Sequence, residues 1–182
     1  MIIVGEHDKK MKPKLRKVIS GGQTGADIAG VMTAKKFGYE VGGWMPLGFK
    51  TLAGSKPRYA ELYGMLEHSS ASYPPRTHCN VSESDGTIRF AFNFDSAGEK
   101  CTLKAIEKFK KHHIDVDCIN PRSVSEVVLW IIQKEIEILN VAGNSEKSAM
   151  GITEFVEDYL SQVFDSLRYI GENYVETIFD GK

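Results

Sequence analysis

Cysteine is scarce in this sequence, and neither sign of charge clearly outweighs the other. The cysteines are odd in number, lie far apart and form no CxxC pair: Cys79, Cys101 and Cys118. A disulfide framework is therefore not expected, and the pattern favours a reducing, cytoplasmic setting. The formal net charge of -1 argues against a general nucleic-acid partner, because such binders usually carry a basic excess.

Long hydrophobic runs and metal-binding motifs are also missing. The apolar run that follows Met1 is only "IIV", which is too short for a signal peptide or a membrane span, so no membrane contact is expected. The histidines show no spacing such as HExxH, and no Ser-His-Asp or Cys-His pairing follows from their positions: His7, His68, His78, His112 and His113. We therefore expect no metal site.

The sequence does contain a regular alternation of strand and helix patterns. Segments rich in β-branched and large apolar residues are typical of strands: 14–20, 39–44, 87–93, 114–120 and 138–143. Between and after them, apolar residues recur at helical spacing in 26–38, 102–113, 123–137 and 152–167. This order predicts an α/β fold, namely a Rossmann-like three-layer domain with a mainly parallel sheet and helices on both faces.

We expect the chain to divide into three parts. Residues 1–14 form an N-terminal extension, residues 15–168 form the domain, and residues 169–182 form an amphipathic tail that docks on the domain or on another subunit. Residues 44–86 show weak periodicity. A short helix is expected at 58–66, and the rest of this segment is either a long functional loop or a misread element.

The segments that follow the strands are the places to look for a ligand site. In a parallel α/β sheet, ligands bind beyond the carboxyl ends of the strands. Five stretches fall there in the predicted fold, and four of them contain glycine: "GGQTG", "GGWMPLG", "DSAGEKCT", "NPRS" and "AGNSEKSAMG". This coincidence favours a binding site at that edge of the sheet.

The first of these loops, "SGGQTGAD" at 20–27, has two interpretations. Backbone N–H groups at a helix N-terminus attract anions, and glycines let the loop approach a phosphate closely. Alternatively the loop is only a sharp turn in which Thr24 caps the helix and Asp27 lies favourably in its first turn. It is not a P-loop, because no Lys-Ser/Thr pair follows the last glycine.

Three other segments carry candidate groups. Gly43 would admit a ligand ring that lies against Trp44, although Trp44 packing under the domain edge is the more ordinary interpretation. Arg76 suits bidentate contact with phosphate. Glu99 opens a helix and could act as an acid or base or bind ribose hydroxyls, or it could only be an acid placed favourably in the first helical turn.

Taken together and in order, these motifs resemble the "putative molybdenum carrier" family. That family is a circularly permuted branch of the SLOG superfamily, which is related to the "lonely guy" proteins. The resemblance rests on "ISGGQTGAD", "GGWMPLG", "RTHCNVSESDGT" and "NVAG…GI" and covers about residues 16–166. It implies a SLOG-like Rossmannoid domain that binds a nucleotide or a similar phosphorylated ligand. Molybdenum cofactor, a pterin that bears a phosphate, is one candidate, and relatives include nucleoside-monophosphate phosphoribohydrolases.

The resemblance also implies a set of ligand-binding residues: Gly21, Gly22, Gln23, Thr24, Gly25, Asp27, Gly43, Trp44, Arg76, Thr77, Asn80, Ser84, Asp85 and Gly143, to which the loop after the third strand adds Gly98. That loop departs from the family pattern, since Ser96-Ala97-Gly98-Glu99 stands where Thr-Gly-Gly-Thr is usual. The added carboxylate would crowd a phosphate, so the departure favours an altered ligand specificity.

Three function classes follow from the sequence. The first is a non-catalytic binding or carrier protein for a nucleotide derivative or a molybdopterin-type cofactor, with its phosphate held by glycine-rich loops. The second is a nucleotide hydrolase that uses a loop carboxylate, with Glu99, Asp85 and Asp27 as candidates. The third is an interaction module without a small ligand. A homo-oligomer, either a dimer or a tetramer, is expected.

Overall fold

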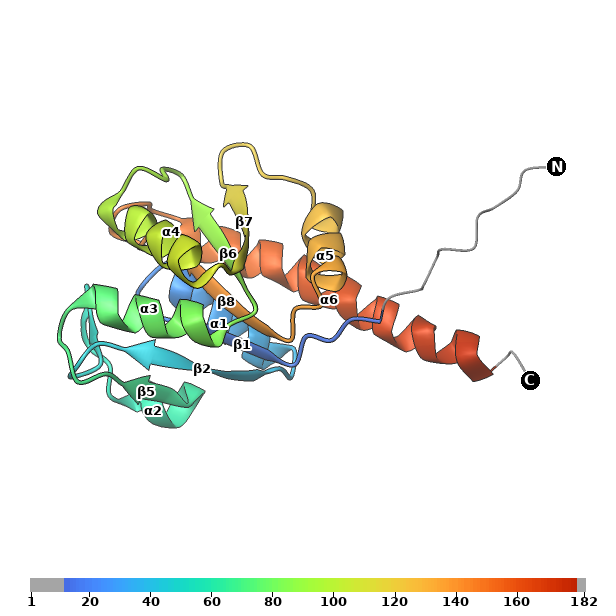
Figure 1. The fold of residues 1–182 in the computed structure, drawn as a ribbon, viewed down its shortest axis with the longest axis horizontal. Helices are drawn as coiled ribbons and strands as arrows, with labels where there is room; N and C mark the ends of the chain where they lie inside the picture. The colour runs from blue at the N-terminus through green and yellow to red at the C-terminus, as the bar shows by residue number, and fades with distance from the viewer. Residues whose placement is uncertain (1–11, 180–182) are drawn as a thin grey trace.

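A six-stranded sheet forms the centre of the protein in the computed structural model, which describes residues 12–179 (Figure 1). The strand order is β5-β2-β1-β8-β6-β7, and all five neighbouring pairs are parallel. Two further short strands, β3 and β4, pair as an antiparallel hairpin. The strands are β1 Lys17–Ser20, β2 Glu40–Met45, β3 Lys50–Thr51, β4 Gly54–Ser55, β5 Met65–Glu67, β6 Gly86–Ala91, β7 His112–Asp117 and β8 Ile138–Gly143.

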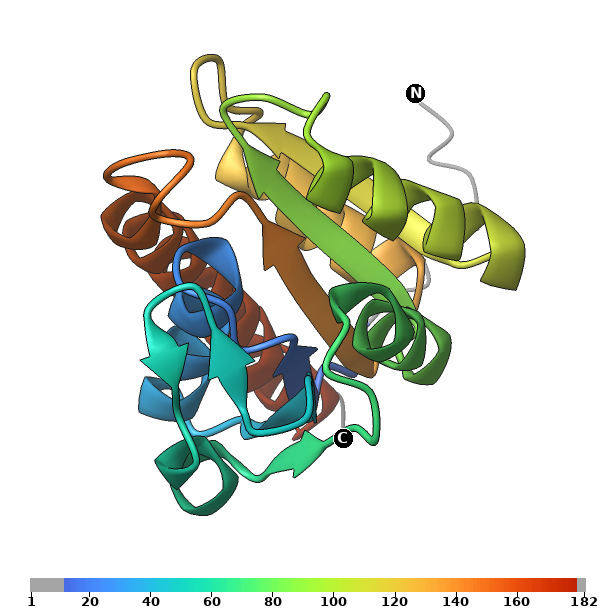
Figure 2. The ribbon, with the colours of Figure 1, turned by 90° about the vertical axis from the view of Figure 1, so that its left-hand side faces the viewer.

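Helices cover both faces of this sheet. On one face α1 packs against α6, and α6 packs against α5, whereas α3 and α4 pack together on the other (Figures 1 and 2). The short α2 lies beside the edge strand β5. The helices are α1 Ala26–Lys36, α2 Arg58–Tyr63, α3 Tyr73–Glu83, α4 Ala97–Phe109, α5 Val124–Gln133 and α6 Ile152–Phe179. The expected three-layer Rossmann-like fold is confirmed.

The largest hydrophobic core lies between the sheet and the α1–α5–α6 layer. Phe90 on β6 makes edge-on ring contacts with Phe155 and Tyr159 on α6. All six residues of β6 are buried, as is typical of a parallel strand with helices on both sides. One of them, Arg89, is charged, and its Nη1 donates a hydrogen bond to the backbone C=O of Glu99 in the first turn of α4.

Two expectations for residues 44–86 need correction. The residues around Arg76 form the helix α3 rather than a loop. The helix expected at 58–66 ends at Tyr63, because Gly64 adopts a left-handed conformation with φ 63 and residues 65–67 pair with β2 as a strand.

The last helix runs on through the expected boundary at residue 168. α6 is continuous from Ile152 to Phe179, so the predicted tail begins as part of this helix rather than as a separate element. Most of the expected N-terminal extension lies outside the described residues. Between residues 12 and 179, no helix is long and apolar enough to cross a membrane.

Candidate functional site

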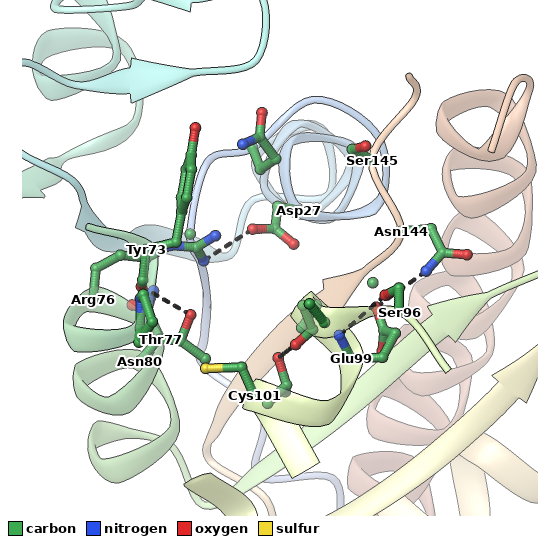
Figure 3. Close-up of a pocket in the computed structure, with 18 of the residues that line it drawn as sticks. Asp27, Tyr73, Arg76, Thr77, Asn80, Ser96, Glu99, Cys101, Asn144 and Ser145 are labelled. Atoms are coloured by element: carbon green, nitrogen blue, oxygen red, sulfur yellow. Dashed lines mark hydrogen bonds and ion pairs between the residues drawn. The ribbon is translucent and has the colours of Figure 1, made fainter. Parts of the chain in front are cut away.

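A cavity of about 440 Å³ opens beyond the carboxyl ends of β1, β6 and β8 (Figure 3). Its walls come from the loops after these strands and from the first turns of α1, α3 and α4. Predicted residues that line it are Gly21, Gln23, Asp27, Arg76, Thr77, Asn80, Gly98, Glu99 and Gly143. The size lies within the usual range for small-molecule pockets.

The glycine-rich loop after β1 shapes one wall of the cavity. A side chain at Gly21 would overlap the guanidinium of Arg76, so the absence of a Cβ makes room for that charge. Gly25, with φ 93, is the N-cap of α1, so the cap is not Thr24. The Gln23 carboxamide accepts a hydrogen bond from the N–H of Leu52 at 2.9 Å, which holds the β3–β4 hairpin beside α1 (Figure 2).

Arg76 and Asp27 form an ion pair at the cavity wall. The Arg76 Nη1 to Asp27 Oδ2 distance is 3.2 Å, and the two side chains are 12% and 5% exposed. Burial raises the pKa of Asp27, while the charge of Arg76 and the backbone N–H groups of Gln23 and Gly143 oppose that rise. The Nε of Arg76 is buried and makes no hydrogen bond to any described residue.

Glu99 lies in the first turn of α4 and is 2% exposed. Its Oε1 accepts a hydrogen bond from Asn144 Nδ2 at 3.3 Å, and its Oε2 is 3.8 Å from Arg89 Nη1. Burial raises the pKa of Glu99 to about 7; Arg89 counteracts the rise and the negative charges of Asp27 and Asp115 add to it. A carboxyl group of this kind changes its protonation near neutral pH.

Asn144 joins three parts of the cavity. Its Oδ1 accepts hydrogen bonds from the N–H groups of Phe92 and Asn93, and its Nδ2 donates to Glu99. Its backbone C=O accepts the N–H of Ala26 in the first turn of α1. The loops after β6 and β8 and the start of α1 are therefore connected through this one residue.

Asn80 lines the cavity and also links α3 to Trp44 at the end of β2. Asn80 Oδ1 accepts the N–H of Trp44 at 2.8 Å, and Asn80 Nδ2 donates to the Trp44 C=O at 3.1 Å. The Trp44 indole N–H donates to Glu83 at 2.9 Å. The Trp44 backbone and indole N–H thus anchor the end of β2 to α3, and Trp44 is not among the residues that line the cavity.

The structure corrects the predicted site at Ser84 and Asp85. Asp85 Oδ2 accepts the N–H groups of Glu137 and Ile138 at 3.0 and 2.8 Å, and Ser84 Oγ donates to the Val81 C=O. Both residues precede β6, so they lie at the amino ends of the strands, away from the cavity. Their polar groups close local turns, and Asp85 is removed from the catalytic candidates.

Four glycine-rich-loop residues also fall outside the cavity lining: Gly22, Thr24, Gly25 and Gly43. Gly43 has φ 127, and a Cβ there would overlap the Ser20 C=O, so this glycine permits the close approach of β2 to β1. Thr24 and Gly25 line a separate shallow pocket together with Ile28.

Sequence reasoning missed several members of the site as ligand candidates. Tyr73, Cys101 and Asn144 line the cavity; Asn144 could have been found, because it directly follows a predicted strand. Arg89 was missed although a charged residue inside an apolar strand is itself a signal. No group of three or more His, Cys, Asp or Glu side chains arranged to hold a metal occurs among residues 12–179.

The parallel sheet, its two helical layers and the cavity at the carboxyl ends of the strands place the protein in the Rossmann-like α/β class. The model of the circularly permutated YpsA SLOG family matches residues 18–164, and the chain belongs to this family.

A solved structure supports the same assignment. It is described as a "putative molybdenum carrier protein" from Syntrophus aciditrophicus SB, with 33% sequence identity and a TM-score of 0.76. The match covers 84% of the present chain and 96% of that one. No curated protein matches the chain.

Proposed function

We propose that the protein binds and carries a small phosphorylated molecule, either a nucleotide derivative or a molybdopterin-type cofactor, in the cavity at the carboxyl ends of the strands. One observation carries this proposal: the first turns of α1 and α4 meet at a single cavity that also contains Arg76. Helix N-termini and an arginine guanidinium both suit phosphate oxygens.

The polar lining suits a heterocycle as well as a phosphate. Thr77, Asn140 and Ser148 provide hydroxyl and amide groups around the cavity. The name of the Syntrophus protein supports a molybdenum-bearing ligand as one candidate cargo. Since the described residues form no metal-binding cluster, the cargo's own atoms would hold the metal.

The first test is to look for bound ligand directly. Native mass spectrometry of the purified protein should show added mass, and nucleotides, pterins and their phosphates should be screened by thermal shift. A phosphorylated compound is expected to raise Tm. If none does and no ligand copurifies, the proposal is wrong.

A matched pair of glycine variants locates the binding. Gly98 lines the cavity, and the nearest atom to an added Cβ there is Ser96 Oγ at 4.0 Å. Gly98→Leu is therefore expected to fold, to fill part of the cavity and to weaken binding of the screened ligand by at least about tenfold. Gly171→Leu, in α6 and free of neighbours within 4 Å, should bind as the wild type does.

A nucleotide hydrolase is the second candidate, and the state of Glu99 favours it. Its pKa of about 7 leaves a proton available near neutral pH, as a general acid needs. Nucleoside monophosphates should then release free base, measured by chromatography, and Glu99→Gln should abolish that release. Unchanged substrate would exclude this reaction.

We further propose that the protein forms a homo-oligomer through the C-terminal part of α6. Among the side chains that the structure describes in this helix, up to Asn173, the last strongly buried one is Leu167, at 2% exposure, whereas Tyr169 is 66% exposed. The helix continues to Phe179, and a second subunit would give that extension a packing partner.

A further inference from the structure

The carboxyl group of Glu99 lacks a full set of partners. Oε1 accepts one hydrogen bond from Asn144, and Oε2 accepts none from the described residues although it is buried. Burying an ionised carboxylate with so few donors is costly, whereas the neutral acid is buried at much lower cost.

The nearest cation is committed to another acid. Arg89 Nε and Nη2 donate to the two carboxylate oxygens of Asp115 at 2.8 and 2.5 Å. Its Nη1 donates to the backbone C=O of Glu99 at 3.3 Å and is 3.8 Å from the Glu99 carboxylate. Arg89 thus fixes the position of Glu99, but Asp115 neutralises much of its charge.

The other charged groups around the cavity do not supply a counter-ion. Asp27, on α1, disfavours ionised Glu99 and itself holds Arg76, on α3, in the 3.2 Å ion pair. The thiols of Cys101 and Cys118 have pKa values raised by burial, so both are neutral near pH 7. Because Asp27 lies in an ion pair with Arg76, we count it as ionised. The charges of Asp27, Arg76, Arg89, Asp115 and Glu99 then sum to -1 with Glu99 ionised and to zero with Glu99 protonated.

We propose that an anionic ligand enters this cavity together with one proton, which Glu99 takes up. Glu99 is then a specificity-determining residue, because its proton sets the charge that the cavity accepts, and Arg89 is the residue that positions it. This inference rests on the proposed function and defines the ligand class as oxyanions and phosphate monoesters.

Reciprocal linkage gives the expected dependence on pH. An anion in the cavity disfavours ionised Glu99, so ionised Glu99 must disfavour the anion by the same free energy. Above about pH 7 the free protein has lost this proton, and the ligand Kd should weaken by about tenfold per pH unit. A neutral ligand would show no such slope.

The test is calorimetric titration of the full chain with guanosine 5′-monophosphate and with molybdate. Molybdate is a tetrahedral dianion that does not itself titrate near neutral pH, so any proton uptake belongs to the protein. Heats measured in two buffers of different ionisation enthalpy at about pH 8 should give nearly one proton taken up per ligand.

Two variants assign that proton. Glu99→Gln mimics the neutral acid, so it should take up no proton, bind about tenfold more tightly than the wild type at about pH 8, and match it at about pH 6. Glu107→Gln removes the same charge from an exposed position on α4 and should behave as the wild type does.

The outcomes separate this inference from the proposed function. Binding without proton uptake, or uptake that persists in Glu99→Gln, overturns the inference and leaves the proposed function standing. If neither guanosine 5′-monophosphate nor molybdate binds at either pH, the inference is wrong; if in addition no compound of the thermal-shift screen binds and no ligand copurifies, the proposed function is wrong as well. The protonation of Glu99 can also be measured in the ligand-free protein by infrared spectroscopy. The band of a protonated carboxyl group should be present in the wild type at about pH 6 and lost at about pH 8. The same band should be missing in Glu99→Gln. Its absence from the wild type would also overturn the inference.

Discussion

Individual polar residues in this protein are sorted by which end of the sheet they occupy. Glu99 and Asp27 lie at the carboxyl ends of the strands, where burial raises both pKa values. Asp85 lies at the amino ends, where its carboxylate accepts two backbone N–H groups. The three acids look equivalent in the sequence, yet only the first two can affect a ligand.

The free energy of unfolding should depend on pH because folding raises the pKa of Glu99. The value rises from 4.5 to about 7 on folding, so the folded state binds more protons than the unfolded state within that window. The free energy of unfolding is therefore expected to fall as pH rises from about 4.5 to about 7, by at most roughly 3 kcal/mol from this group.

Urea unfolding of the wild type and Glu99→Gln measures this contribution. The variant should gain stability relative to the wild type between about pH 5 and about pH 8, by roughly 2–3 kcal/mol. Glu107→Gln should show no such gain. A constant difference between wild type and Glu99→Gln across this range would contradict the raised pKa.

Elements were predictable where their apolar pattern was strong. The strands at β1, β2, β6, β7 and β8 and the helix patterns of α1, α4, α5 and α6 follow from periodicity, because their buried faces must be apolar. The helix α3 was not predicted. Its Pro74 and Pro75 look like loop residues, but proline is tolerated in the first turn of a helix, where the N–H groups have no helical partner.

The site was predictable only to the level of loops. Glycines after strands indicated the correct edge of the sheet, and Asp27, Arg76 and Glu99 do converge on one cavity. The role of Arg89 beneath Glu99 depends on the β6–β7 register, which pairs Arg89 with Asp115. No local sequence pattern encodes that pairing, so the charge state of the cavity required the three-dimensional structure.

The connection between α3 and β2 should depend on Asn80. Asn80→Ala removes both hydrogen bonds to the Trp44 backbone and leaves its N–H without that partner. Removing one partner of a buried hydrogen bond typically costs about 1–3 kcal/mol, so a loss of roughly 2–3 kcal/mol is expected in urea unfolding. Asn120→Ala, at an exposed position, should change stability by less than about 0.5 kcal/mol. Equal effects of the two variants would show that the Asn80 link does not stabilise the fold.

At the scale of the whole molecule, the C-terminal end of α6 projects away from the sheet and the other helices (Figure 1). Among the α6 side chains that the structure describes, which end at Asn173, those in the main core extend to Leu167, with Ile170 packed against them; the helix itself reaches Phe179. An isolated helical segment of a few turns is only marginally stable in water. A partner surface would stabilise this extension, and the amphipathic sequence of residues 169–182 suits one, as the proposed homo-oligomer requires.

Deleting residues 170–182 tests whether this partner is a second subunit. The shortened chain keeps nearly all of the core, so it should stay folded by circular dichroism while its mass by light scattering falls from that of a dimer or tetramer to that of a monomer. Deleting residues 1–11 is the control for loss of a chain end. This deletion should leave the number of subunits in the assembly unchanged. If the chain without residues 170–182 keeps the wild-type subunit number, α6 does not hold the assembly together. Ligand binding should survive the deletion in either case, because every residue that lines the cavity precedes residue 149.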